Sequence, residues 1–167
     1  WSRAPILERN RTDPYLNTAP WVVRDGDGYR IFYVSGHEWL YKDLPRYNIK
    51  TGHSKDGKHW VREGHVCLDF KDDNEHALAR PYVVIEDGLW RMWFSYKSAD
   101  YTIGYAESFD GLNWERLDHL AGIDVSPSGF DSEMIEYAAT VLHEGRRFMF
   151  YNGNNYGHGG IGLAVSK

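Results

Sequence analysis

The chain has 167 residues, 42% of them apolar, which suits one domain with a buried core and excludes wholesale disorder. Its 24 acidic and 19 basic residues give a formal net charge of −5, which argues against a nucleic-acid-binding module. No apolar run approaches the roughly 20 residues needed to span a bilayer, and the lone Cys67 can form no intrachain disulfide.

The first elements along the chain have the pattern of short antiparallel strands. Aromatic residues make up 16% of the chain and glycine is abundant, a composition that favours β-sheet. An apolar run around Val22 ends in the turn Asp25–Gly28, and alternating bulky residues follow at Ile31–Tyr33. A second turn, Asp56-Gly57, leads into a further strand. Asp-Gly turns join antiparallel strands, so residues 15–67 are predicted to form a four-stranded unit.

The same order of signals recurs twice, over residues 75–121 and 133–167. The block Ser54–Trp60 returns as Ser108–Trp114, with the Asp-Gly turn and the Trp in the same places. In the third copy, Ile161–Ser166 matches the strand that precedes this block. Because the repeated Asp and Trp residues recur, we expect them to be structural, with Asp capping its turn and Trp packing between units.

Four-stranded repeats of this period are typical of β-propeller blades. The predicted fold class is therefore all-β, a single propeller-type domain with three four-stranded antiparallel repeats; a β-solenoid is the alternative, although its repeats are usually shorter. Residues 1–7 begin with Trp1-Ser2-Arg3, which is similar to Trp60-Val61-Arg62, and could close the last blade or a blade of another chain. Three blades are too few for an ordinary ring. We expect a partial propeller that self-associates into an oligomer-completed ring, with a dimer favoured, or a longer parent protein.

Several motifs resemble a known superfamily. Ile103–Ala106 and Ser108–Trp114 look like the blades of the five-bladed propeller glycosidases, which include the family 43 arabinanases and xylosidases and the family 32 invertases. Uncharacterised glycosidase-like propeller proteins are similar in their C-terminal three blades, through Ala79-Arg80-Pro81, Gly122–Ser126, Asp131–Tyr137 and Tyr151–Asn154. The resemblance covers essentially the whole chain. It implies a glycoside hydrolase-like propeller that hydrolyses or binds a carbohydrate; a non-catalytic sugar-binding or self-assembling scaffold is the alternative.

The candidate catalytic residues are acids that lie before or on the first strand of a repeat, because first strands line the channel of a propeller. Glycoside hydrolysis needs one carboxyl to protonate the leaving oxygen and a second, ionised one to activate water or attack carbon. Glu75, Glu133 and Glu136 are the candidates for these roles. The resemblance places an Asp base in the first blade, but Asp13 lies in a context that departs from the family pattern. The sequence therefore leaves open whether a single chain is an active enzyme.

Other polar and aromatic residues are candidates for substrate binding. Arg80 either orients substrate or pairs with Glu75 or Glu136, because a buried cation needs a carboxylate partner. Aromatic rings outside the repeated pattern could stack on sugar rings. The full set of substrate-binding candidates is Arg80, Asp131, Trp39, Asn152 and Tyr156.

The eight histidines form no close metal-binding pattern, and no phosphate-binding loop is present. We expect no cofactor and no metal, although the resemblance allows a Ca²⁺ ion in the channel. The expected partners are a carbohydrate and further copies of the chain, not nucleic acid or membrane. A cytoplasmic location is favoured, but a removed signal peptide would leave no trace in this sequence.

Overall fold

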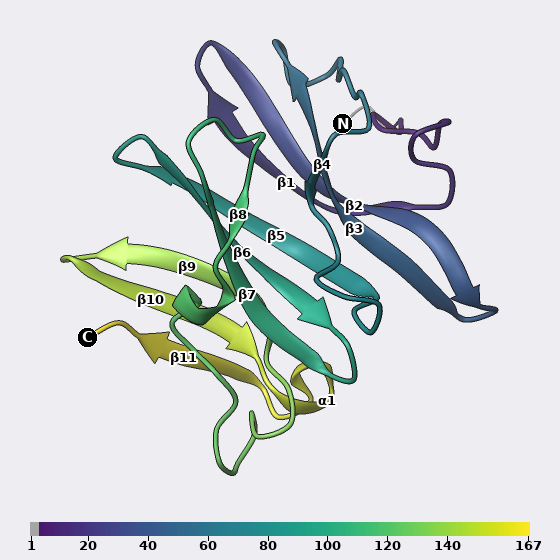
Figure 1. Ribbon diagram of the computed structural model, residues 1–167. Coiled ribbons are helices and arrows are strands. Elements are labelled where there is room, and N and C mark those ends of the chain that lie inside the picture. The colour runs from purple at the N-terminus through teal and green to yellow at the C-terminus, as the bar shows by residue number, and fades with distance from the viewer. Residues whose placement is uncertain (1–3) are drawn as a thin grey trace.

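The computed structural model describes residues 4–167 and consists almost wholly of β-strands (Figure 1). Its helical parts are a 3-10 turn, Asp118–Leu120, and the short turn α1 (Asn154–Gly157), in which Asn155 and Tyr156 are left-handed. The prediction of an all-β, propeller-type chain is confirmed. Among the described residues, no helix has the length and apolar character that a membrane crossing requires.

The strands form three successive antiparallel units, which we call blades. The first blade contains β1 (Asn17–Asp25), β2 (Gly28–Tyr41), β3 (Leu44–Ser54) and the short β4 (Val66–Leu68), which also pairs with β3. An isolated bridge between His53 and Val61 stands where a fourth strand was expected.

The second blade contains β5 (Ala77–Glu86), β6 (Leu89–Lys97), β7 (Tyr101–Ser108) and β8 (Glu115–Arg116) in that order. One parallel bridge, Tyr47 to Ala77, joins it to the first blade. The third blade is a separate sheet of β9 (Glu136–His143), β10 (Arg146–Asn152) and β11 (Ile161–Val165), with β10 in the middle. The blades follow one another across the molecule, from β1–β4 at the upper right of Figure 1 to β9–β11 at the lower left.

Each first strand carries the same backbone irregularity. Ala19, Arg80 and Tyr137 have φ values of 47°, 50° and 59°, a left-handed conformation that non-glycine residues seldom adopt. The pairing register of β1, β5 and β9 shifts at these residues. A bulge of this kind re-aims the side chains on either side of it. Its recurrence makes the three positions equivalent and fixes the alignment of the blades.

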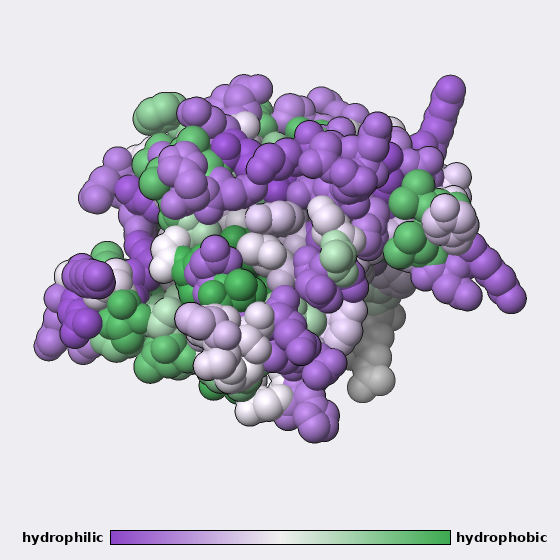
Figure 2. Space-filling model, turned by 60° about the horizontal axis from the view of Figure 1, so that its bottom comes forward, coloured by the Kyte–Doolittle hydropathy of each residue, from purple (hydrophilic) through white to green (hydrophobic). Residues whose placement is uncertain are grey.

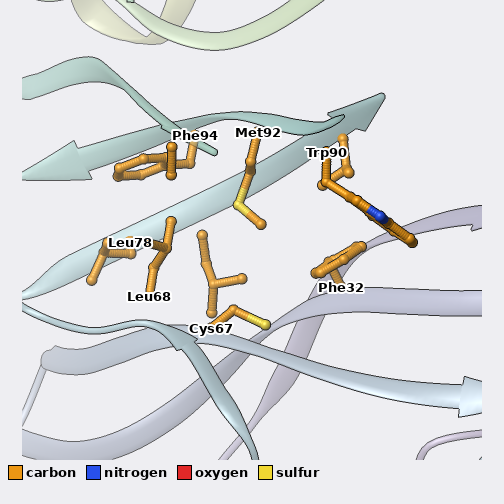
Figure 3. Close-up of a cluster of buried hydrophobic side chains, with 10 residues drawn as sticks. Phe32, Cys67, Leu68, Leu78, Trp90, Met92 and Phe94 are labelled. Carbon is orange, nitrogen blue, oxygen red and sulfur yellow. The ribbon is translucent and has the colours of Figure 1, made fainter. Parts of the chain in front are cut away.

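Apolar cores lie between neighbouring blades. Between the first and second blades, Phe32 of β2 lies near Trp90 of β6, with ring centroids 6.1 Å apart, and Met92 and Cys67 pack alongside (Figure 3). Burial of one such large apolar side chain contributes roughly 1.5–3 kcal/mol. A second core around Trp93 and Met149 joins the second and third blades.

The N-terminal segment lies against the first blade. Residues 1–3 of the expected closing segment 1–7 lie outside the described residues. Residues 4–7 form no strand and line a small cavity together with Asn17, Thr18 and Tyr33. Figure 2 shows the molecule with the bottom of Figure 1 turned toward the viewer. On this face, apolar side chains gather in patches within a mainly hydrophilic surface.

Candidate functional site

The three first strands meet at a cavity near the centre of the arc of blades. A cavity of about 200 Å³ is lined by three equivalent stretches, one from each first strand: residues 19–21, 80–82 and 137–139. The rings of Trp21 and Tyr82 lie with centroids 4.4 Å apart. Each blade contributes structurally equivalent residues to this cavity. The cavity therefore lies where the sequence analysis predicts the propeller channel, along the first strands.

Glu136 is the first residue of β9 and precedes the left-handed Tyr137. Its side chain is 0% exposed, and neither carboxylate oxygen has a hydrogen-bond partner among the described residues. Burial raises the pKa of the Glu136 carboxyl above its ordinary value, although the Asn152 side chain and the charges of Lys97 and Arg80 oppose this shift. Burial therefore favours the protonated form of this carboxyl more than solvent would.

Tyr137, the residue after Glu136, belongs to a group of four tyrosines that contact one another. We call Tyr47, Tyr101, Tyr137 and Tyr156 the tyrosine cluster. The Tyr47 and Tyr101 hydroxyls are 2.6 Å apart, and the Tyr101 ring lies 5.9 Å from Tyr137 and 6.2 Å from Tyr156. Burial and the hydrogen bond with Tyr47 raise the pKa of Tyr101. The cluster therefore presents neutral aromatic rings with polar tips.

Two cations belong to the same region. Lys97 donates to the Tyr156 hydroxyl at 3.1 Å and lies 5.2 Å from the centre of the Tyr101 ring. Arg80 lies over the Tyr137 ring at 5.3 Å and is exposed. Glu136 thus has aromatic rings and two positive charges near it, and among the described residues it has no carboxylate-binding Arg of its own.

Glu75 has a different environment. Arg116 donates to both of its carboxylate oxygens, at 2.7 and 2.8 Å, and Glu75 is only 2% exposed. The backbone N–H of Lys71 also donates to it. Arg116 further donates to Asp118 at 2.9 Å, and these carboxylates outweigh burial and raise the pKa of the guanidinium. Glu75 is therefore a fully paired carboxylate that ties β8 to the start of β5.

Asp13 has the corresponding place in the first blade. It accepts hydrogen bonds from Arg62 at 2.7 Å, Ser35 at 2.9 Å and Lys50 and Tyr33 at 3.1 Å, and is 0% exposed. Burial opposes ionisation, but these donors overcome it and hold the pKa of the Asp13 carboxyl below its ordinary value. Arg62 and Arg116 both lie two residues after the repeated Trp. The pair of an acid before the first strand and an Arg two residues after the repeated Trp is thus a repeated structural element.

The remaining sequence candidates are divided between this region and the surface. Asn152 faces Glu136 across the β9–β10 pair, and Tyr156 belongs to the tyrosine cluster. Asp131 is 4% exposed and accepts a 2.7 Å hydrogen bond from Tyr151, whose pKa is raised to about 12 by burial and by this bond. Glu133 is exposed. Trp39 lies near the tip of the β2–β3 hairpin and is 48% exposed.

The structure therefore brings together Glu136, Arg80, Asn152 and Tyr156 around one region, and places Glu75, Glu133 and Trp39 elsewhere. The sequence analysis did not single out Tyr47, Tyr101, Tyr137 or Lys97. Within residues 4–167, no group of three or more His, Cys, Asp or Glu side chains could hold a metal ion. The channel-bound Ca²⁺ stays a prediction.

Comparison with known proteins supports the fold. No family model matches the chain. The uncharacterised protein Rv1502 of Mycobacterium tuberculosis is 42% identical over 167 residues, which cover 99% of this chain and 56% of the relative. The chain therefore spans about half the length of the curated relatives it matches.

Comparison with solved structures also supports the fold. A glycoside hydrolase superposes on 98% of this chain with a TM-score of 0.80 at 21% identity, over 51% of its own length. A family 117 glycoside hydrolase of Zobellia galactanivorans covers 99% of the chain, with a TM-score of 0.80, 14% identity and 57% of its own length. A family 32 β-fructofuranosidase of Bombyx mori covers 87%, with a TM-score of 0.70, 19% identity and 33% of its own length. The chain has the same fold as the matching parts of these glycoside hydrolases. The expected likeness to glycosidase propellers is thereby confirmed for the fold.

Proposed function

We propose that this chain binds a carbohydrate against the tyrosine cluster, beside the buried carboxyl of Glu136. The observation that carries the proposal is Glu136 itself. It is fully buried, it has no hydrogen-bond partner among the described residues, and burial raises its pKa. A buried polar group without a partner is costly, so its presence in a fold calls for a ligand or a reaction that uses it.

The surroundings of Glu136 suit a sugar. Tyrosine combines an apolar ring face, which can stack on a pyranose or furanose ring, with a hydroxyl that can bond to sugar hydroxyls. The exposed rim of the cluster carries Lys97 and Arg80, which donate hydrogen bonds and favour a sugar that carries an acid group. The glycoside hydrolase fold of the chain supports the same class of ligand.

In a hydrolytic reaction Glu136 would act as the general acid. A protonated carboxyl gives its proton to the glycosidic oxygen as the bond to the anomeric carbon breaks, and a second, ionised carboxyl activates water or attacks that carbon. Asp13 and Glu75, two further buried acids that precede first strands, are held by Arg62 and Arg116. Among the described residues, Glu136 is thus the one of these three buried acids that no Arg holds. A single free acid favours sugar binding over hydrolysis for this chain alone.

Binding of defined oligosaccharides tests the proposal. Isothermal titration calorimetry of the purified chain against pentose, hexose and uronate oligomers should give saturable binding to at least one class. Tyr156→Ala should weaken that binding about 3- to 10-fold, the equivalent of about 0.7–1.4 kcal/mol, because a stacking ring is lost. Tyr156 is 58% exposed, so its removal should leave the fold intact.

A matched control is available on the β2–β3 hairpin. Tyr41 is 76% exposed and is not part of the tyrosine cluster, so Tyr41→Ala should bind sugar like the wild type. Equal weakening by both substitutions, or no binding to any oligomer, would refute the proposal. Release of reducing ends by wild-type protein but not by Glu136→Gln would show that the chain also hydrolyses the sugar.

A further inference from the structure

Lys97, at the end of β6, differs from the other partly buried cations of the chain. Among residues 4–167, every other Lys or Arg that is not exposed forms an ion pair with a carboxylate, as Arg116 does with Glu75. Lys97 is half-buried, and no carboxylate of these residues pairs with it. Burial removes water from a charge, and only an opposite charge or hydrogen bonds recover that cost. Lys97 therefore suits an anion that the described residues do not supply.

The ammonium of Lys97 has hydrogen-bond donors that are not used within the described structure. It carries three N–H groups, and its acceptor among residues 4–167 is the Tyr156 hydroxyl, at 3.1 Å. The centres of the Tyr101 and Tyr156 rings lie 5.2 and 5.6 Å from the ammonium, within the range of a cation–π attraction. Tyr156 is 58% exposed, so the ammonium lies beside a ring that a ligand can reach. The remaining N–H groups are therefore available to an acceptor on such a ligand.

Glu136 is near Lys97 but does not neutralise it. Neither carboxylate oxygen of Glu136 has a hydrogen-bond partner among the described residues, and no ion pair joins the two side chains. The charges of Lys97 and Arg80 oppose the rise in the pKa of Glu136, yet burial still keeps that pKa above its ordinary value. A carboxyl that is shifted toward its neutral form is a weak counter-charge. Positive charge therefore exceeds negative charge around the tyrosine cluster, which favours an anionic ligand.

Arg80 places a second cation on the same cluster, beside the central cavity. It lines the cavity of about 200 Å³, lies 5.3 Å from the centre of the Tyr137 ring and forms no ion pair with a carboxylate of residues 4–167. Its φ of 50° is left-handed, as is that of Ala19 at the equivalent place in the first blade. Because Ala19 makes the same bend, the backbone does not require an Arg there. Strained residues of this kind are common at functional sites, so the guanidinium is available for a ligand.

We infer that Lys97 and Arg80 bind an acidic group of the carbohydrate, so that the site selects a uronate or a sulfated sugar over the same sugar in neutral form. This inference rests on the proposed carbohydrate binding and adds the chemical class of the sugar and the residues that select it. A carboxylate and a sulfate ester share a negative charge and acceptor oxygens, which ammonium and guanidinium groups bind through charge-assisted hydrogen bonds. The tyrosine rings contact the apolar face of the same sugar.

Pairs of charged and neutral ligands test this selectivity. Isothermal titration calorimetry compares uronate oligomers with their methyl esters, and sulfated oligosaccharides with their desulfated forms. At least one charged form should bind about 10-fold or more tightly than its neutral partner, and the pair that shows the difference identifies the acidic group. Lys97→Met keeps an unbranched apolar side chain and removes the charge. It should bind the charged form about 10-fold more weakly than the wild type and the neutral form equally well.

Two further variants separate a role in selectivity from a general effect of charge. Arg80→Gln should weaken binding of the charged form in the same direction as Lys97→Met. Lys42→Met is the matched control, because Lys42 is an exposed cation that follows β2 and lies outside the tyrosine cluster, and it should keep the full preference. Thermal denaturation establishes that each variant keeps its fold. A preference that survives both Lys97→Met and Arg80→Gln would overturn the assignment of these residues.

The wild-type protein gives a test that needs no variant. Raising the ionic strength from about 0.02 M to about 0.5 M should weaken binding of the charged ligand and leave binding of its neutral partner unchanged, because salt screens the attraction of partly exposed charges. Equal affinity for the charged and neutral forms would overturn this inference while the proposed carbohydrate binding stands. Absence of binding to every oligomer would refute the carbohydrate proposal and this inference together.

Discussion

Replacing Glu136 by Gln should make the protein more stable at neutral pH. Glu136 is 0% exposed and has no hydrogen-bond partner among the described residues, so its charged form is costly. An unsatisfied buried polar group costs about 1–3 kcal/mol, and more when it is charged. Gln keeps the shape and removes the charge. Because the Gln amide stays without a partner, the gain comes from the charge alone. We expect the free energy of unfolding to rise by about 1.4 kcal/mol for each unit by which burial raises the pKa, or about 3–6 °C in Tm for a chain of this size.

The effect should depend on pH in a defined direction. The folded-state pKa of Glu136 is raised above its ordinary value of 4.5. The native state therefore holds a proton that the unfolded state releases, and the wild type loses stability as the pH rises from 4.5 through the folded-state pKa. Below that window both states are protonated, so the advantage of Glu136→Gln should shrink toward zero in acid.

Thermal denaturation followed by circular dichroism, from acid to mildly alkaline pH, measures this difference. Glu133→Gln is the control, because Glu133 is exposed three residues away and its replacement should leave the free energy of unfolding within about 0.5 kcal/mol of the wild type at every pH. The reasoning fails if Glu136→Gln is less stable than the wild type at neutral pH. It fails equally if the two curves stay parallel at all pH values.

The buried ion pairs and the buried thiol give three further tests. Arg116→Leu should lower the free energy of unfolding, measured by urea denaturation, by about 3–5 kcal/mol, because it leaves Glu75 buried and unpaired. Adding Glu75→Gln should restore part of this loss. Strictly additive effects of the two substitutions would contradict the pairing. Asp13→Asn should destabilise at neutral pH. The pKa of Asp13 in the folded state lies below its ordinary value of 3.8, so the stability that its charged form contributes is present above pH 3.8 and is lost as the pH falls through the folded-state pKa. The free energies of unfolding of the wild type and of Asp13→Asn should therefore converge in acid. A difference that stays constant with pH would contradict this reasoning. Burial raises the pKa of the Cys67 thiol to about 12, so thiol reagents should label it only at the rate of unfolding, and fast labelling of the folded chain would show that the site is open.

The blades were predictable because their signals are local. Asp-Gly turns and alternating apolar residues determine where antiparallel strands pair, and the repeat itself identifies blades. The fourth strands were predicted as full strands, but the structure reduces them to the two residues of β8 and the bridge at Val61. Sequence pattern marks where such a strand starts at Trp60 and Trp114, but backbone pairing decides how long it runs.

The candidate site was predictable only in part, because its members meet from six strands and the turn α1. Glu136 and Tyr156 were found from their positions before a strand and outside the repeat. Tyr47 and Tyr101 were missed, since nothing local shows that residues 54 positions apart share a hydrogen bond. The pairing of Glu75 with Arg116 did leave a signal. An Arg recurs two residues after the repeated Trp, and comparison of that recurrence with the recurring acids would have indicated a structural pair.

The three left-handed residues of the first strands suggest how blades of this kind can diverge after duplication. The same backbone bend recurs at Ala19, Arg80 and Tyr137, yet one side chain is a methyl group, one a guanidinium and one a phenol. Selection can therefore replace any of these side chains without a change in backbone conformation, because the backbone itself bears the strain of the bend. All three line the cavity of about 200 Å³ at which the first strands meet. A copied blade thus brings an unassigned position to this cavity, and the side chain that lines it can change one substitution at a time.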